Sequence, residues 1–201
     1  MGLRESKKQH TREVIAGEAM RLFTTRGFDH VTVAEVAAAA RVSEKTVFNY
    51  FPTKEDLFFD EVPAREAALA GAVRGCRTGK ELVAALHQSQ AAQCTRLSSP
   101  RFAIFARMIE ESSALQVKEL SVMAGFVEVL AEAIRAELGA DERDARLAAG
   151  LLVSVHWQLF RTARRQALAG KHGPAAARRL RDELDRAYGL LEHGLREIHT
   201  D

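Results

Sequence analysis

Residues 32–56 are the stretch that most limits what this chain can fold into. Within it Thr32, Ser43 and Thr53 each stand where a side-chain oxygen can cap the N-terminus of a helix. Glu35 follows Thr32 at the spacing of a capping box, and apolar residues flank the caps as hydrophobic staples do. Three closely spaced helix starts predict a helix-turn-helix that is followed at once by a further helix.

The segment before this stretch predicts one more helix. Gly27 stands where a helix commonly ends in the left-handed conformation. Over residues 11–26 the apolar side chains recur at the spacing of one helical face, at Ile15, Ala16, Ala19, Leu22 and Phe23. We therefore expect an N-terminal three-helix DNA-binding domain over residues 11–53, preceded by a flexible basic arm over residues 1–10.

The remainder, residues 54–201, predicts a bundle of longer helices, for about nine helices in the whole chain. Ala is abundant, there are only 4 Pro, and no alternating pattern of strands is present, so the fold class is all-α. One helix is expected over residues 54–75 with a bend at Pro63, and Gly139 and Gly170 end later helices. We expect residues 54–201 to form a second, C-terminal domain.

Composition excludes several classes of protein. The formal net charge of +2 gives no global positive field, so any argument for nucleic acid must come from local charge. Cys76 and Cys94 have no metal or redox spacing, which suits a reducing compartment. The N-terminus lacks an apolar secretory region, and no run of about 18 apolar residues suggests a membrane span. These features predict a cytoplasmic protein that does not interact with a membrane.

The third helix carries the main functional prediction. If Val47 and Phe51 face the core, the helical step places Lys45, Phe48 and Asn49 on the opposite face, with Thr46 at its margin. Lys, Asn, Thr and apolar side chains can all contact base edges in the major groove. The alternative is an ordinary three-helix core with a partly exposed Phe.

Lys54 gives a second argument. It lies in the first turn of a predicted helix, where the macrodipole disfavours a cation by roughly 0.3–1 kcal/mol. A bound phosphate beside Lys54 and the Tyr50 hydroxyl would explain its position. The alternative is a solvated Lys without a partner.

The run from Ile15 through Leu57 resembles the N-terminal domain of the TetR family of bacterial transcriptional regulators. The matching motifs are Gly27-Phe28, Thr32-Val33-Ala34-Glu35-Val36-Ala37, Val42-Ser43, Thr46-Val47-Phe48, Tyr50-Phe51 and Lys54-Glu55-Asp56-Leu57.

The resemblance implies an all-helical homodimer of Ω-like shape that binds a palindromic operator in double-stranded DNA and holds a small-molecule inducer in its C-terminal domain. It also implies that Thr46 and Phe48 approach bases while Tyr50 and Lys54 hold phosphates. Asn49 replaces the aromatic or basic residue often found in the family. The predicted DNA-binding residues are Thr32, Ser43, Glu44, Lys45, Thr46, Phe48, Asn49, Tyr50 and Lys54.

Apolar stripes in the C-terminal helices predict a pocket for a lipophilic or aromatic small molecule, with His156 and Trp157 as its polar groups. The candidate residues are Phe102, Phe105, Met108, Ile109, Met123, Phe126, Val127, Leu130, Leu152, His156, Trp157 and Phe160. The alternative is that these stripes form only a core.

The last two helices predict the surface of a homodimer. Two such helices from each subunit would form a four-helix bundle. The apolar residues assigned to this surface are Leu147, Leu151, Leu180, Leu184, Ala187, Tyr188 and Leu191.

The sequence has no P-loop, dinucleotide-binding glycine motif, nucleophile elbow, di-iron motif or zinc spacing. We expect no catalytic activity, no cofactor and no metal. The prediction is a ligand-responsive transcriptional regulator, most simply a repressor that a small molecule releases from its operator. The alternatives are a helix-turn-helix protein without an inducer, or a helical small-molecule-binding protein or enzyme.

Overall fold

A computed structural model of the protein describes residues 3–193. This part of the chain contains ten α-helices and no strands, which confirms the all-α fold class. The chain forms two compact units. Among the described residues, unit 1 comprises residues 3–63 together with residues 108–118, and unit 2 comprises residues 64–107 and 119–193.

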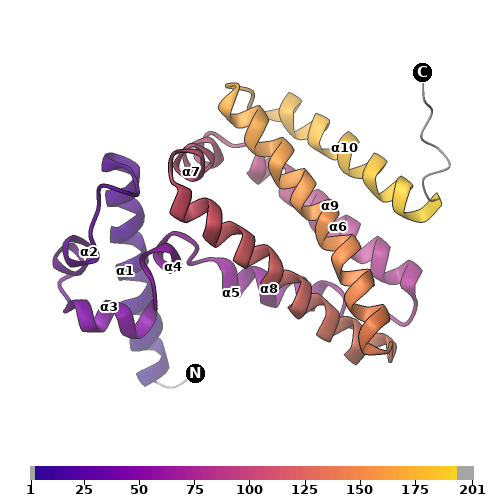
Figure 1. The fold of residues 1–201 in the computed structure, drawn as a ribbon, viewed down its shortest axis with the longest axis horizontal. Helices are drawn as coiled ribbons and strands as arrows, with labels where there is room; N and C mark the ends of the chain where they lie inside the picture. The colour runs from indigo at the N-terminus through magenta and orange to yellow at the C-terminus, as the bar shows by residue number, and fades with distance from the viewer. Residues whose placement is uncertain (1–2, 194–201) are drawn as a thin grey trace. The chain divides into compact units, whose positions relative to one another are not determined.

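Unit 1 is built from four N-terminal helices and one further segment. The helices are α1 (Leu3–Arg26), α2 (Val33–Ala39), α3 (Glu44–Tyr50) and α4 (Lys54–Phe58), and the further segment joins the end of α7 (Pro100–Glu111) to the start of α8 (Ser113–Leu138). In Figure 1, α3 lies across the N-terminal half of α1. The rings of Phe23, Phe28 and Phe58 meet at centroid distances of 4.9 to 6.5 Å and form an aromatic core.

The short helices begin where the caps predict. The side chains of Thr32, Ser43 and Thr53 accept hydrogen bonds from the backbone of the third helical residue of α2, α3 and α4. The boxes at Thr32 and Thr53 are reciprocal, with Glu35 and Asp56 accepting from the cap backbone.

The first helix begins earlier than the sequence suggested. α1 starts at Leu3, so the flexible arm expected over residues 1–10 is corrected to helix from residue 3 onward. Side-chain bonds at helical spacing support these turns: Gln9 donates to Glu13 at 2.8 Å, and the Thr11 hydroxyl donates to the Lys7 carbonyl at 3.0 Å. Residues 1 and 2 lie outside the described residues.

The helix expected over residues 54–75 is two helices. α4 ends at Phe58, and α5 (Val62–Ala72) begins after a short turn. Pro63 therefore lies in the first turn of α5, where its missing N–H has no helical partner to lose, instead of bending a longer helix. This split gives ten helices in the described chain instead of nine.

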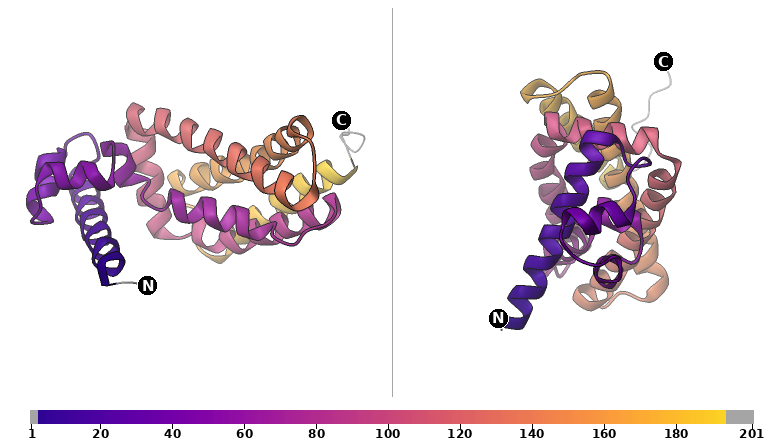
Figure 2. Two further views of the ribbon diagram at one scale, coloured as in Figure 1. Left: turned by 90° about the horizontal axis from the view of Figure 1, so that it is seen from below. Right: turned by 90° about the vertical axis from the view of Figure 1, so that its left-hand side faces the viewer.

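Unit 2 contains the rest of the bundle. Besides α5 and the larger parts of α7 and α8, it has α6 (Gly79–Leu97), α9 (Glu142–Leu168) and α10 (Pro174–His193). Figure 2 shows these helices packed as a bundle, and α10 lies against α6 and α9. Within residues 3–193, no helix combines the length and the apolar character needed to cross a membrane.

Three residues assigned to the dimer surface pack inside the chain instead. Leu180, Leu184 and Tyr188 are at most 3% exposed, so they cannot face a partner subunit. They lie on the buried side of α10, which packs on α6 and α9, and the ring of Tyr188 lies 4.8 Å from that of His87 of α6. Leu147 and Leu151 of α9 remain 62% and 59% exposed.

Candidate nucleic-acid interface and effector site

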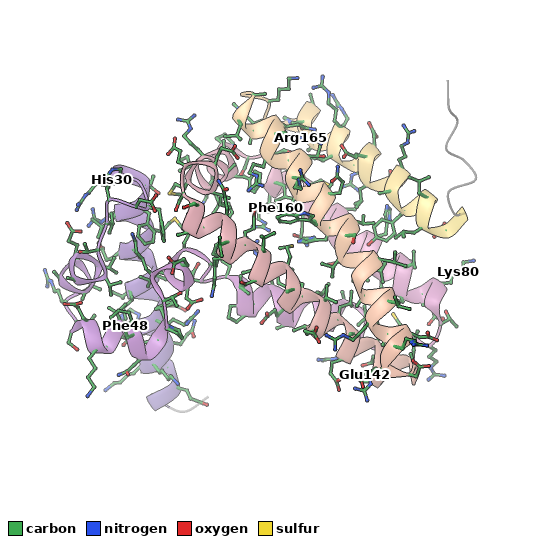
Figure 3. The ribbon with its side chains drawn as sticks, in the orientation of Figure 1. His30, Phe48, Lys80, Glu142, Phe160 and Arg165 are labelled. Carbon is green, nitrogen blue, oxygen red and sulfur yellow. The ribbon has the colours of Figure 1, made fainter. Side chains whose placement is uncertain are left out.

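The candidate DNA-contacting face of α3 is exposed, and the opposite face is buried in the core of unit 1. Val47 and the cap residue Phe51 are each 1% exposed, whereas Phe48 is 48% exposed. Lys45 and Asn49 are also exposed, and Figure 3 labels Phe48 on this helix. A short helix fixed by Val47 and Phe51 thus presents an aromatic, a cation and an amide together.

The start of α3 is held by local hydrogen bonds. The Ser43 Oγ atom accepts from the Thr46 N–H at 3.1 Å and lies 2.8 Å from the Thr46 hydroxyl. Arg41, in the turn before it, has a φ of 57°. This left-handed geometry suits the sharp turn between α2 and α3, although it costs an ordinary L residue roughly 1–2 kcal/mol.

The predicted DNA-binding residues differ in their exposure and in the hydrogen bonds that they form within the protein. Ser43 and Thr46 bond to each other, and Thr32 bonds to Glu35 in the cap of α2. The exposed members of the set are Thr32, Ser43, Glu44, Lys45, Phe48 and Asn49, and the half-buried members are Thr46, Tyr50 and Lys54.

Arg12 supports the end of α3, and sequence reasoning missed it. Its guanidinium donates to the carbonyls of Tyr50 at 3.1 Å and Asp60 at 3.2 Å, and it lies 4.3 Å from the centroid of the Phe51 ring. One signal was available, because Arg12 precedes Ile15 and Ala16 at helical spacing and so shares their buried face.

Lys54 has a partner within unit 1. Its Nζ atom lies 4.2 Å from the centroid of the Phe28 ring, at cation–π distance. Desolvation lowers the pKa of Lys54, and the charges of Asp29, Glu55 and Glu35 oppose that shift. The sequence argument explained a cation at this position by a bound phosphate. The contact with Phe28 is a second explanation, within the protein itself.

Two polar contacts attach residues 108–118, the end of α7 and the start of α8, to the N-terminal part of unit 1. Lys118 Nζ lies 2.6 Å from Asp56 Oδ1, and Asp56 is the carboxylate that closes the cap of α4. The Ser112 hydroxyl donates to Asp29 at 2.8 Å. Although burial opposes it, bonds from Lys118 and Thr53 lower the pKa of Asp56.

Five of the predicted effector-site residues form two aromatic groups in unit 2. Phe102 and Phe105 of α7 lie 5.2 and 6.3 Å from Phe160 of α9, and Phe126 of α8 lies 5.8 Å from His156. Leu130 and Leu152 are buried in the same unit, and Met123, Val127 and Trp157 are half-buried there. Met108 and Ile109 are buried too, but they belong to unit 1.

His156 is a neutral group within this region. Burial lowers the pKa of His156 to about 4, and the positive charges of Arg65 and Arg96 act in the same direction. At neutral pH its imidazole therefore offers one donor and one acceptor and no charge.

Unit 2 also encloses an ion pair and unsatisfied polar atoms. Arg164 of α9 donates to Glu119 of α8 at 2.9 Å, and the two side chains are 16% and 4% exposed. The buried side-chain atoms that lack a hydrogen-bond partner include Gln90 Oε1, Ser98 Oγ, Gln166 Oε1 and the Tyr188 hydroxyl. In residues 3–193 no three His, Cys, Asp or Glu side chains are grouped to hold a metal ion.

The capped helices α2 and α3, with the exposed face of α3, form a helix-turn-helix. A family model described as bacterial regulatory proteins, tetR family, matches residues 15–60. The transcriptional regulator TcmR of Streptomyces glaucescens is 35% identical over 72 residues, which is 36% of this chain and 32% of TcmR.

Two further matches cover most of the chain. MftR of Mycobacterium tuberculosis, provisionally named as a regulator of mycofactocin biosynthesis, is 27% identical over 146 residues, 72% of each chain. The crystal structure of the TetR-family repressor FadR of Thermus thermophilus with lauroyl-CoA has the same fold. It superposes with a TM-score of 0.55 at 23% identity, covering 94% of this chain and 97% of FadR. Residues 15–60 thus match the N-terminal domain of the tetR family of bacterial regulators, and the chain shares the fold of a TetR-family repressor.

Proposed function

We propose that this protein is a dimeric repressor that binds a palindromic operator through α3 and is released by a lipophilic or aromatic small molecule. Residues 11–53 would bind DNA, and residues 54–201 would bind the effector and form the dimer. The observation that carries the DNA-binding part is the exposure of Phe48 beside Lys45 and Asn49, opposite the buried Val47.

Each exposed group on α3 matches a feature of the major groove. The Lys45 ammonium can donate to guanine acceptors or to phosphate, Asn49 can pair with adenine, and the Phe48 ring can contact a thymine methyl group. In a dimer, two such helices would enter successive major grooves about 34–36 Å apart. Leu147 and Leu151, both exposed on α9, supply an apolar face for that dimer.

Three features of unit 2 support the effector part. Phe102, Phe105 and Phe160 offer aromatic surface, and neutral His156 offers a donor and an acceptor. The unpaired Gln90 and Tyr188 oxygens could receive polar groups of a ligand. The FadR match binds lauroyl-CoA, so acyl-CoA thioesters are one class to test, together with free fatty acids and aromatic compounds.

Helix α8 is the proposed route from effector to DNA. Its residue Lys118 bonds to the cap of α4, and the next residue, Glu119, forms the buried pair with Arg164 of α9. A ligand that displaces α9 or α8 would thus act on Asp56 and on the helix that begins at Lys54. The separation of the two α3 helices in the dimer would change, and operator affinity would fall.

A binding experiment tests the DNA part. Fluorescence anisotropy with a duplex from the region upstream of the protein's own gene should show salt-dependent binding by the wild-type chain. Lys45→Gln should weaken it and reduce the slope of log K against log salt by about one. Lys80→Gln removes the same charge from an exposed site on α6 and should have no effect. Equal binding by the wild type and Lys45→Gln contradicts this assignment.

A second experiment tests the effector part. Thermal shift of the full chain with lauroyl-CoA, lauric acid and a panel of aromatic compounds should identify a stabilising class, and the same compound should release the DNA. Phe160→Ala should weaken that release while leaving DNA binding in the absence of ligand intact. If stabilising compounds leave the DNA complex unchanged, the protein is a helix-turn-helix protein without an inducer among these compounds.

A further inference from the structure

We propose that a groove between the first turns of α1 and the end of α3 holds a phosphate of the DNA backbone, with Lys8 as its contact. This α1–α3 groove rests on the proposed DNA-binding function and adds α1 to a contact surface otherwise assigned to α2, α3 and α4.

The groove has a volume of about 510 Å³. Its walls come from two elements, because Glu5, Lys8, Gln9 and Arg12 belong to α1 whereas Asn49 and Tyr50 belong to α3. Asn49 and Tyr50 also belong to the predicted DNA-contacting set, so the groove continues the candidate interface of α3. Figure 1 shows α3 crossing α1.

The helical start of α1 makes this site possible. Lys8 and Arg12 are four residues apart and therefore lie on the same side of the helix. Arg12 is fixed by its bonds to the carbonyls of Tyr50 and Asp60 and by Phe51, which ties this side of α1 to the end of α3. A flexible arm would leave Lys8 without a defined position, whereas a helix that begins at Leu3 holds it beside Asn49 and Tyr50.

The charge of the groove suits a phosphate. Lys8 is exposed, and none of the ion pairs within the described part of the chain involves it, so its ammonium is available. The hydrogen-bond partners of Arg12 are carbonyl oxygens, which leave its positive charge without a carboxylate to balance it. Glu5 is the one acid on the wall, against two cations. Contacts of this kind fix the register of a protein on DNA and carry no sequence information themselves.

The test compares neighbouring lysines in the full-length protein. Lys8→Gln and Lys7→Gln make the same charge change one residue apart on α1, but only Lys8 lines the groove. Anisotropy titrations with the upstream duplex, run from about 0.05 to 0.2 M salt, give the slope of log K against log salt. Release of counterions predicts that the slope changes by about 0.9 for each phosphate that the protein no longer neutralises.

We expect Lys8→Gln to lower the slope magnitude by about one, with a similar fold-loss of affinity on the upstream duplex and on a scrambled duplex. Lys8→Arg should restore the wild-type slope, and Lys7→Gln should change it by less than half as much as Lys8→Gln. Far-UV circular dichroism of each variant checks that α1 remains helical.

Three outcomes overturn the inference. The first is a wild-type slope in Lys8→Gln, and the second is an equal loss of affinity in Lys7→Gln, which would indicate diffuse charge instead of a groove. The third is a loss confined to one DNA sequence, which would indicate a base contact. These outcomes leave the proposed function standing. A wild-type chain that binds neither duplex removes the proposed function itself, and with it the inference.

Discussion

The two units differ in how completely their buried polar groups are paired. In unit 1 the charged side chains are matched to defined partners: Arg12 to two carbonyls, Asp56 to Lys118 and Thr53, and Asp29 to Ser112. Among the described residues, the buried side-chain atoms without a hydrogen-bond partner all belong to unit 2. Each buried unsatisfied group costs about 1–3 kcal/mol.

This contrast suggests different demands on the two units. A helix that contacts base edges must be held in a single position, and the caps, Arg12 and the aromatic core provide that in unit 1. Unit 2 keeps hydrogen-bonding capacity in its interior at a cost in stability. We infer that this capacity serves the proposed effector, because a ligand or ordered water that pairs with those atoms recovers part of the cost.

The largest expected effect comes from breaking the buried pair in unit 2. Glu119→Ala leaves Arg164 charged and largely buried, and should lower the free energy of unfolding by about 3–5 kcal/mol. Urea denaturation followed by circular dichroism measures this decrease. Glu132→Ala is the matched control, since Glu132 is also on α8 but its pair with Arg135 is exposed; it should cost at most about 1 kcal/mol.

A double variant distinguishes the charge from the packing. Replacing both partners, Glu119→Leu with Arg164→Met, should recover most of the stability, because no unpaired charge is then buried. A double variant as unstable as Glu119→Ala would mean that shape, and not charge, dominates at this position.

The next effect is a pH dependence specific to unit 2. The pKa of His156 is about 4 in the folded chain and near 6.5 in the unfolded chain, so between these values the unfolded state binds more protons. Stability should therefore fall as the pH decreases from 6.5 to 4, by about 3 kcal/mol from this group. His156→Phe keeps an aromatic ring beside Phe126 and should remove that part of the slope.

Urea midpoints measured across this pH range for the wild type, His156→Phe and His172→Phe check the assignment. His172 is exposed in the turn before α10, so its replacement should leave the slope unchanged. Parallel pH curves for the wild type and His156→Phe contradict a lowered pKa at His156.

Sequence information was strongest where structure is determined locally. The caps at Thr32, Ser43 and Thr53 and the helix ends at Gly27, Gly139 and Gly170 all depend on neighbouring residues, and the structure confirms them. The inward positions of Val47 and Phe51 followed from the same periodicity.

The sequence predictions were wrong or incomplete where contacts between residues far apart in the chain determine the structure. The stripe of Leu180, Leu184 and Tyr188 was visible in the sequence, but periodicity cannot tell whether an apolar face packs on α6 of the same chain or on a second subunit. The bonds of Lys118 to Asp56 and of Arg164 to Glu119 join helices far apart in the chain, and nothing in their spacing indicated them. The cation–π contact of Lys54 with Phe28 was missed for the same reason.

The smallest expected effect is a pH dependence of stability in unit 1, which comes from Glu35. Bonds from the Thr32 backbone, the Arg26 side chain and the Thr32 hydroxyl lower the pKa of Glu35 to about 2. A lowered carboxyl pKa stabilises the fold above its unfolded value near 4.5, and this contribution disappears as the pH falls from 4.5 toward 2. This pH range lies below most of the range, from 6.5 to 4, over which His156 affects stability.

Glu35→Gln tests this contribution because a Gln can still close the capping box without a charge. The variant should melt slightly below the wild type at pH 6, and the difference in melting temperature should narrow as the pH falls below 4.5. In an Arg26→Gln background the difference at pH 6 should be smaller, since the Arg26–Glu35 pair at 2.7 Å is already absent there. A difference that is constant with pH would mean that the Glu35 charge contributes nothing, and that unit 1 lacks the acid-sensitive contact assigned to it.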